Sequence, residues 1–179
     1  SLRQVEDMLF ERGIDITYET IRLWWNRFGS HLASKIRKKR SYPQHYSSWR
    51  WHIDEVFIKV RGRTYYLWRA VDHEGEVLDA VVTRKRDRKA AVRVLQKLFK
   101  KYGRPVAIVT DRLASYKAAF KELNCSHKQE VGLYLNNRAE NSHLPFRRRE
   151  RAMQLFRKEE TLQKFASIHG QIYNHFNGE

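Results

Sequence analysis

The sequence predicts an α/β fold in which a mixed sheet is flanked by helices, and three observations support this prediction. Three consecutive stretches of β-branched and aromatic residues are separated by two short turns, a pattern typical of an antiparallel meander. An amphipathic stretch then precedes residues 106–109, which are apolar on both faces and suit a central strand covered on both sides. With 179 residues, the chain can form one such domain and a small addition.

The remaining elements follow in an order that narrows the fold class. The strands of the meander are expected at residues 51–60, 64–71 and 77–83. Helices are expected at residues 89–102, at 112–123, from near Arg138 onward and at 161–176, with a short edge strand at 128–131. A meander, a helix, a central apolar strand and further helices form the order of the ribonuclease H-like fold, with its parallel strands after the meander.

The first 30 residues predict two short helices around a turn. Gly13 is suited to end the first helix, Thr17 to cap the second and Gly29 to close it. On a basic protein this arrangement indicates a helix-turn-helix, and a plain helical hairpin packed on the main domain is the alternative. The second helix of a helix-turn-helix would present these side chains to DNA: Arg22, Asn26 and Arg27.

We therefore expect three parts: a helix-turn-helix at 1–30, a basic linker at 31–48 and a catalytic core at 49–179. The linker carries a run of cations that can follow a phosphate backbone, among them Lys38, Lys39 and Arg40. Both ends of the sequence fall directly beside helical patterns, so we expect a longer parent protein.

The composition points to a polyanionic partner. Lys and Arg number 36 against 20 Asp and Glu, for a net charge of +16, which favours nucleic acid over other partners. No apolar run reaches the roughly 20 residues that span a bilayer, so we expect no membrane segment. The single cysteine, Cys125, excludes an internal disulfide.

Asp54 is the residue that most needs an explanation. Along the first strand it shares a face with Val56, Ile58 and Val60, because side chains on one face of a strand recur every second residue. A buried carboxylate there requires a cation, a hydrogen-bond network or an open cleft. An Arg or Lys from a neighbouring strand is one possible partner.

Two further acids can approach Asp54. Asp111 follows the central apolar strand, which can lie beside the first strand, and Glu140 begins a later helix. Alternatively, Asp111 caps the helix from Arg112, and Glu140 only complements a helix dipole. Three carboxylates without Cys or paired His are typical ligands of Mg²⁺ or Mn²⁺, and two such ions support phosphodiester chemistry on DNA or RNA.

Three phrases carry a family resemblance: WHIDEVFIKVRGRTYYLWRAVD, IVTDRLASY and YLNNRAENSHLPFRRRERAM. Together with the N-terminal segment they are similar to the DDE transposases of bacterial and archaeal insertion sequences, most closely the insertion-sequence-six family. The segment between Asp111 and Glu140 is several residues shorter than the family norm, which a shortened loop around residues 124–127 accommodates.

The resemblance implies a ribonuclease H-like core, a helix-turn-helix that reads terminal inverted repeats, and Mg²⁺-dependent strand cleavage and joining. The catalytic and metal-binding acids carry over to Asp54, Asp111 and Glu140. The basic residue seven positions after the glutamate carries over to Arg147, suited to hold a phosphate. Nearby cations that extend this grip are Arg148 and Arg151, and His143 can contact DNA or assist the metal site.

The sequence thus predicts a transposase that uses double-stranded DNA, both terminal inverted repeats and target, and assembles as a homo-oligomer that holds two element ends. We expect it in the cytoplasm of a prokaryote. Two alternatives stay open: a ribonuclease H-like nuclease that cuts without joining, and a regulator whose helix-turn-helix binds DNA beside an inactive core.

Overall fold

The computed structural model describes residues 1–40, 50–132, 134–153 and 156–176. The chain divides into two compact units, residues 1–40 and residues 41–179, which are considered separately below. Within the described ranges, no helix combines the length and apolar character that crossing a membrane requires.

The first unit consists of helices α1 (Leu2–Phe10) and α2 (Tyr18–Arg40). The predicted cap is confirmed, because the backbone N–H of Thr20 donates to Oγ1 of Thr17 at 3.4 Å. The predicted end at Gly29 is wrong, because α2 continues to Arg40 and includes the first part of the expected linker. Residues 30–40 contain no proline, and one glycine inside a helix costs only about 1 kcal/mol. The rest of that linker, residues 41–48, lies outside the described residues.

The helix pair buries little of its apolar surface. No residue of α1 is buried, and all of them are described. On α2, the apolar side chains of Trp24 and Phe28 are 47% and 42% exposed. Two helices alone cannot enclose a core, so much of the apolar surface of this unit stays in contact with solvent.

The second unit contains the predicted mixed sheet. Its strands are β1 (Arg50–Val60), β2 (Arg63–Val71), β3 (Val77–Thr83), β4 (Ala107–Val109) and β5 (Gln129–Glu130). They lie in the order β3-β2-β1-β4-β5. The first three form an antiparallel meander, whereas β4 runs parallel to β1 and β5 runs parallel to β4. This arrangement confirms the ribonuclease H-like sheet expected from the sequence.

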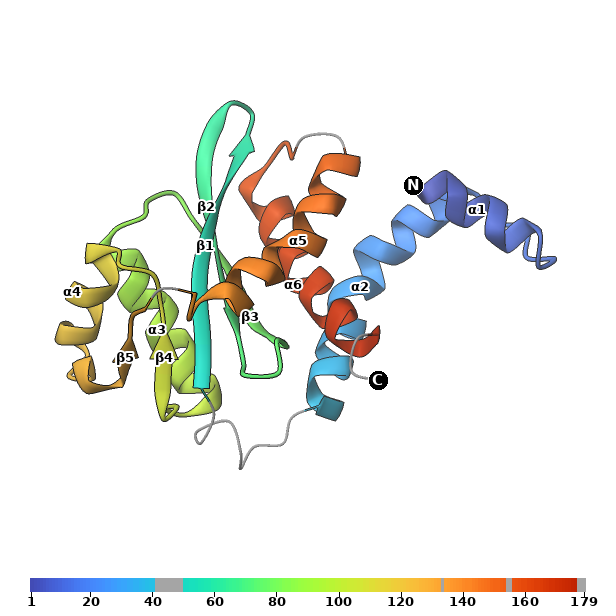
Figure 1. Ribbon diagram of the computed structural model, residues 1–179. Helices are drawn as coiled ribbons and strands as arrows, with labels where there is room; N and C mark the ends of the chain where they lie inside the picture. The colour runs from blue at the N-terminus through green and yellow to red at the C-terminus, as the bar shows by residue number, and fades with distance from the viewer. Residues whose placement is uncertain (41–49, 133, 154–155, 177–179) are drawn as a thin grey trace. The chain divides into compact units, whose positions relative to one another are not determined.

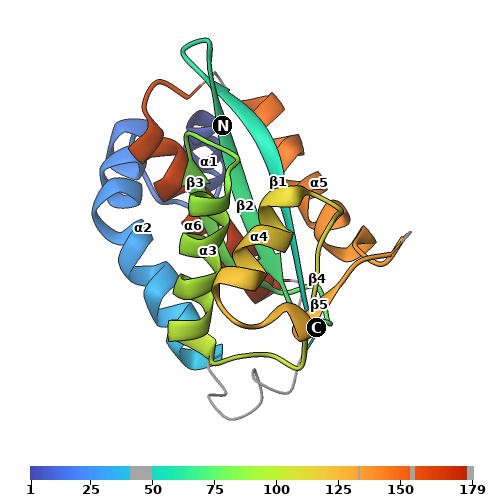
Figure 2. The same cartoon turned by 90° about the vertical axis from the view of Figure 1, so that its left-hand side faces the viewer.

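Helices cover both faces of the sheet (Figure 1). They are α3 (Arg88–Tyr102), α4 (Ala114–Glu122), α5 (Asn137–Ala152) and α6 (Glu159–Phe176). Helices α3 and α4 lie on one face and α5 and α6 on the other, as the turned view in Figure 2 also shows. Gly103 ends α3 with a positive φ of 77°, directly after the expected helix at residues 89–102.

Each face of β1 packs into its own core. Trp51 and Ile53 join the core beneath α3 and α4. Ile58 and Val60, on the opposite face, pack with Phe146 of α5 and with residues of α6. Asp54 belongs by its alternation to the face of Ile58 and Val60, so the sequence placed it on the correct side of the sheet.

Candidate active site

Two of the predicted acids meet because β1 and β4 are parallel neighbours. The register pairs Arg50 with Ala107 and His52 with Val109. If this register is continued for two more residues, Asp111 lies opposite Asp54. Beyond His52 no described strand pairs with this edge of β1, so Asp54 and the end of β4 border an open rim.

A third carboxylate, which the sequence did not predict, joins them there. One oxygen from each of Asp54, Glu55 and Asp111 lies within 4.8 Å of the others, a grouping that can hold a metal ion. The side chains of Asp54 and Asp111 are 16% and 35% exposed, whereas that of Glu55 is 1% exposed. The two aspartates are therefore partly accessible to solvent, whereas the side chain of Glu55 is buried.

Both oxygens of Glu55 already have partners within the protein. Tyr116 donates its hydroxyl to Oε2 at 2.7 Å, and Arg86 pairs with Oε1. Burial raises the pKa of Glu55, against the opposing effects of Tyr116 and Arg86. Burial and the nearby Glu55 also raise the pKa of Tyr116 well above its usual value, so the hydroxyl remains a donor.

Arg86 also contacts Asp111, because its Nη2 lies 3.1 Å from Oδ2. One guanidinium therefore bridges Glu55 and Asp111 within the carboxylate cluster. Since a guanidinium and a divalent cation seek the same oxygens, Arg86 is a competitor for a metal at this position.

The alternative role of Asp111 as a helix cap is wrong. Helix α4 begins at Ala114, its cap is Leu113, and that cap makes no side-chain hydrogen bond. Oδ1 of Asp111 instead accepts from the N–H of Leu113 at 3.0 Å, which fixes the carboxylate in a turn ahead of the helix.

Helix α5 positions the other aspartate. Nε2 of His143 lies 3.1 Å from Oδ2 of Asp54. Arg69 of β2 lies opposite Asp54 in the register, yet its Nε donates to Oγ of Ser142 instead. The partner of Asp54 is thus a histidine from a helix rather than an Arg or Lys from the adjacent strand.

The same helix is fastened along β1 at two further points. Asn136, directly before α5, donates from Nδ2 to the carbonyl of Ile53 at 3.1 Å. Arg147 donates from Nη2 to the carbonyl of Phe57 at 2.6 Å. These bonds occupy backbone acceptors of β1 on the stretch that β4 does not cover, and they hold α5 beside the carboxylate cluster.

Glu140 stands one helical turn before His143, in the first turn of α5, and is exposed. It is not among the three clustered carboxylates of the described residues. Residues three apart on a helix are neighbours on its surface, so Glu140 lies on the side of α5 that carries His143.

The predicted DNA-binding residues fall into two groups. On α2, Arg22 pairs with Glu19 at 3.0 Å, Arg27 lies over the ring of Phe28, and Asn26 and Lys38 are exposed. The side chains of Lys39 and Arg40 lie outside the described residues. On α5, Arg148 and Arg151 are exposed, whereas Arg147 is committed to Glu150 at 2.5 Å and to the carbonyl of Phe57.

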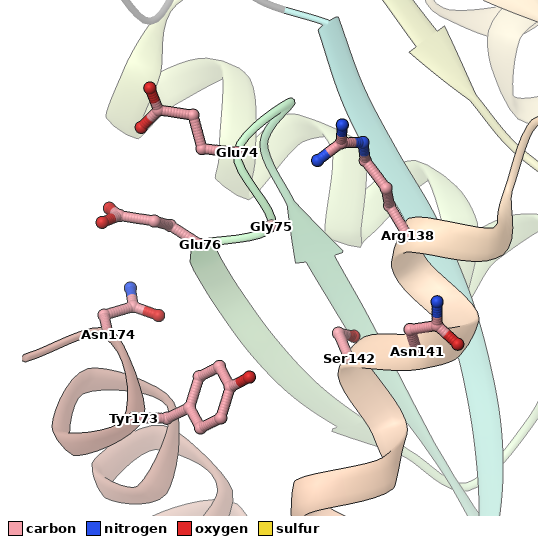
Figure 3. Close-up of a pocket in the computed structure, with 8 residues that line it drawn as sticks. All are labelled: Glu74, Gly75, Glu76, Arg138, Asn141, Ser142, Tyr173 and Asn174. Carbon is pink, nitrogen blue, oxygen red and sulfur yellow. The ribbon is translucent and has the colours of Figure 1, made fainter. Parts of the chain in front are cut away.

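A pocket of about 270 Å³ lies elsewhere in the second unit. Figure 3 shows its wall: the turn between β2 and β3, the first half of α5 with Arg138, Asn141 and Ser142, and the end of α6 with Tyr173 and Asn174. None of the clustered carboxylates lines it. The pocket is therefore separate from the carboxylate cluster.

The donor set at the rim fits a divalent cation. The cluster offers carboxylate oxygens, two of its three carboxylates are partly exposed, and these oxygens are close enough for shared coordination. Such hard oxygen donors are preferred by Mg²⁺ and Mn²⁺.

Several known proteins are similar to this chain. A family model described as a DDE domain matches residues 48–179. The transposase for insertion sequence-like element IS431mec of Staphylococcus aureus (strain Mu50) is 32% identical over 148 residues, 80% of this chain and 64% of that protein. The transposase for insertion sequence element IS257 in transposon Tn4003, also from Staphylococcus aureus, matches to the same extent. The chain therefore spans 64% of the length of these relatives.

Among solved structures, the HTLV-2 integrase catalytic core domain in complex with magnesium (dimeric form) is similar, with a TM-score of 0.49 and 15% identity. That likeness covers 72% of this chain and 85% of the other.

Proposed function

Because the chain belongs to the DDE transposases of the insertion-sequence-six family, we propose that it cuts DNA at the ends of an insertion sequence and joins those ends to target DNA. The observation that carries this proposal is the meeting of Asp54 and Asp111 at an open rim of the sheet. Helix α5, which carries Glu140, is held along the same rim by His143.

The metal ligands in this proposal are Asp54, Asp111 and Glu140. When bound, Mg²⁺ or Mn²⁺, as two ions, neutralises developing charge on the phosphate and favours ionisation of the attacking hydroxyl. His143 orients Oδ2 of Asp54, and Tyr116 with Glu55 fixes the floor of the site. Arg86, which pairs with Asp111, would have to release that carboxylate for it to hold a cation.

The reaction has two displacements at phosphorus. Water first attacks the phosphodiester at the element end, the bond to the 3′ oxygen breaks, and a free 3′-hydroxyl results. That hydroxyl then attacks a phosphodiester of the target, releasing a new 3′-hydroxyl there. Neither step requires a covalent bond to the protein, which agrees with a site built of carboxylates.

The partners in this proposal are double-stranded DNA, as terminal inverted repeats and as target, and a second copy of the chain that holds the other end. Residues 1–40 contact DNA through α2, with Arg22, Asn26 and Arg27 facing bases. Arg148 and Arg151 of α5 contact phosphates, so binding weakens as salt concentration rises.

The test is incubation of the protein with labelled DNA from the ends of its own element, a target plasmid and Mg²⁺. We expect nicked and joined products, and we expect both to vanish in Asp54→Asn but to persist in Glu122→Gln, which removes an exposed acid on α4. Nicking without joining would indicate a nuclease instead. Binding without any cleavage would indicate a regulator.

A further inference from the structure

At the end of the β1–β2 hairpin, residues 56–67, one face of the sheet is exposed at Phe57, Lys59 and Thr64. In both ribbon views this distal hairpin extends past α3 and α4 (Figures 1 and 2). Its other face is buried, because Ile58, Val60, Tyr65 and Leu67 pack beneath α5 and α6. Alternation therefore directs Phe57 and Lys59 toward the uncovered side.

Phe57 is a large apolar residue exposed on that side. Its side chain is 60% exposed although it lies mid-strand, three residues beyond Asp54. Arg147 holds it from α5, with the guanidinium carbon 5.4 Å from the ring centroid and a hydrogen bond to the Phe57 carbonyl. A ring that is fixed in orientation yet open to solvent is a platform on which a flat partner can stack.

The hairpin is also strongly basic. Between Glu55 and Asp72 the sequence has no acid, and the tip carries three exposed cations, Lys59, Arg61 and Arg63. Such a surface attracts a polyanion.

The turn supports a role for one of these cations. Arg61 and Gly62 both have positive φ, 49° and 77°, which is the backbone of a two-residue turn that favours Asn followed by Gly. An arginine is strained at the first position. The turn therefore carries a cation at a position where an asparagine would fold more easily, and strained residues of this kind cluster at functional sites.

The distance to the carboxylates suits DNA. Lys59 is five residues from Asp54, and at about 3.3 Å per residue this is roughly 17 Å, the rise of about five base pairs. Glu55, which clusters with Asp54 and Asp111, alternates onto the same face as Phe57 and Lys59. DNA with its reacting phosphate at this carboxylate cluster can therefore run along that face of the hairpin.

We propose that the distal hairpin binds the DNA beside the reacting phosphate, with Phe57 stacking on an unpaired base and Lys59, Arg61 and Arg63 contacting the backbone. This inference rests on the proposed function for its ligand, and it assigns the surface that grips the DNA end.

Binding is measured by fluorescence anisotropy without divalent metal, using labelled duplexes with a blunt end or a short single-stranded end. Lys59, Arg61 and Arg63 are replaced together by glutamine. The slope of log K against the logarithm of salt concentration then becomes less steep by about 2.7, at about 0.9 per lost phosphate contact. The matched control replaces three exposed cations of α3 and α4, Arg93, Lys100 and Lys117, in the same way. An equal loss in the control overturns the proposal.

Single variants sharpen the test. Arg61→Asn raises the melting temperature because it relieves the turn, yet it weakens DNA binding, a combination that a structural role does not produce. Phe57→Ala weakens binding to the single-stranded end by about tenfold and spares the blunt duplex. Phe57→Trp retains binding to the single-stranded end. Phe176→Ala, which removes another exposed ring, has no effect on it.

If Phe57→Ala binds both DNA ends as the parent protein does, the stacking role is wrong. This outcome is separate from failure of the proposed function, which is read from Mg²⁺-dependent cleavage and its loss in Asp54→Asn. Hairpin-dependent binding without cleavage overturns the proposed function alone.

Discussion

His143 and Asp54 lie 3.1 Å apart, from Nε2 to Oδ2, and so connect helix α5 to the middle of strand β1. The other ring nitrogen of His143 is buried and has no hydrogen-bond partner among the described residues. Because the contact is to a carboxylate, the proton of a neutral ring belongs on Nε2. The histidine then fixes one oxygen of Asp54 and leaves the other for a ligand.

Removing this contact should slow the reaction without removing the acids. We expect His143→Ala to lower the single-turnover rate of strand cleavage by about 10- to 100-fold, the usual effect of losing a group that orients a metal ligand. His143→Gln, which keeps a side-chain amide donor, should recover part of the rate. A rate equal to that of the parent protein would show that Asp54 needs no orientation by α5.

Glu140 can be tested against a matched glutamate. Both Glu140 and Glu160 are exposed in the first turn of a helix, so their contributions to the helix dipole are similar. We expect Glu140→Gln to reduce cleavage at least about a hundredfold and Glu160→Gln to leave it unchanged, with similar melting temperatures. Equal activity of the two variants would remove Glu140 from the catalytic site.

From the ion pairs of Arg86 with Glu55 and Asp111 we predict an effect on metal affinity. Arg86→Ala should bind Mn²⁺ about fivefold more tightly in the absence of DNA, because a half-exposed ion pair that competes for Asp111 is lost. Titration followed by electron paramagnetic resonance measures this affinity. Arg88→Ala is the control, since Arg88 pairs with Glu122 on α4, at 3.1 Å. Weaker Mn²⁺ binding in Arg86→Ala alone would mean that Arg86 organises the cluster instead of competing for it.

His169 should make the fold sensitive to acid. It packs against the rings of Phe146 and Phe165, and burial, with contributions from Arg69 and Arg149, lowers its pKa from 6.5 to about 4. As pH falls through 6.5, the unfolded chain gains a proton that the folded chain does not. The free energy of unfolding therefore decreases between pH 6.5 and about pH 4.

Urea denaturation of the parent protein and His169→Gln over this pH range checks the prediction. The free energy of unfolding of the parent protein, relative to that of His169→Gln, should decrease as the pH is lowered. A difference independent of pH would show that His169 titrates normally in the folded state.

The sheet was predictable from the sequence because its signals are local. The bounds of β2 and β3 lie within one residue of those expected, since alternating apolar residues and short turns determine both. The end of α2 was not predictable from Gly29, because the residues that follow favour the helix enough to outweigh one glycine.

The site was predictable only in part. Asp54 and Asp111 follow from strand positions, and the cluster confirms that they meet. Glu55 was missed because adjacent strand residues point to opposite faces, a rule that fails at an uncovered edge that side chains from both faces can reach. Arg86 was missed because it lies in a run of basic residues, which usually indicates only a solvated surface. The role of Glu140 stays a prediction.

Helix α5 is tied to β1 at Ile53, Asp54 and Phe57, which has a mechanical consequence. A load applied to the hairpin passes through Arg147 into the helix that orients Asp54. The position of the hairpin and the orientation of the Asp54 carboxylate are therefore linked through one helix.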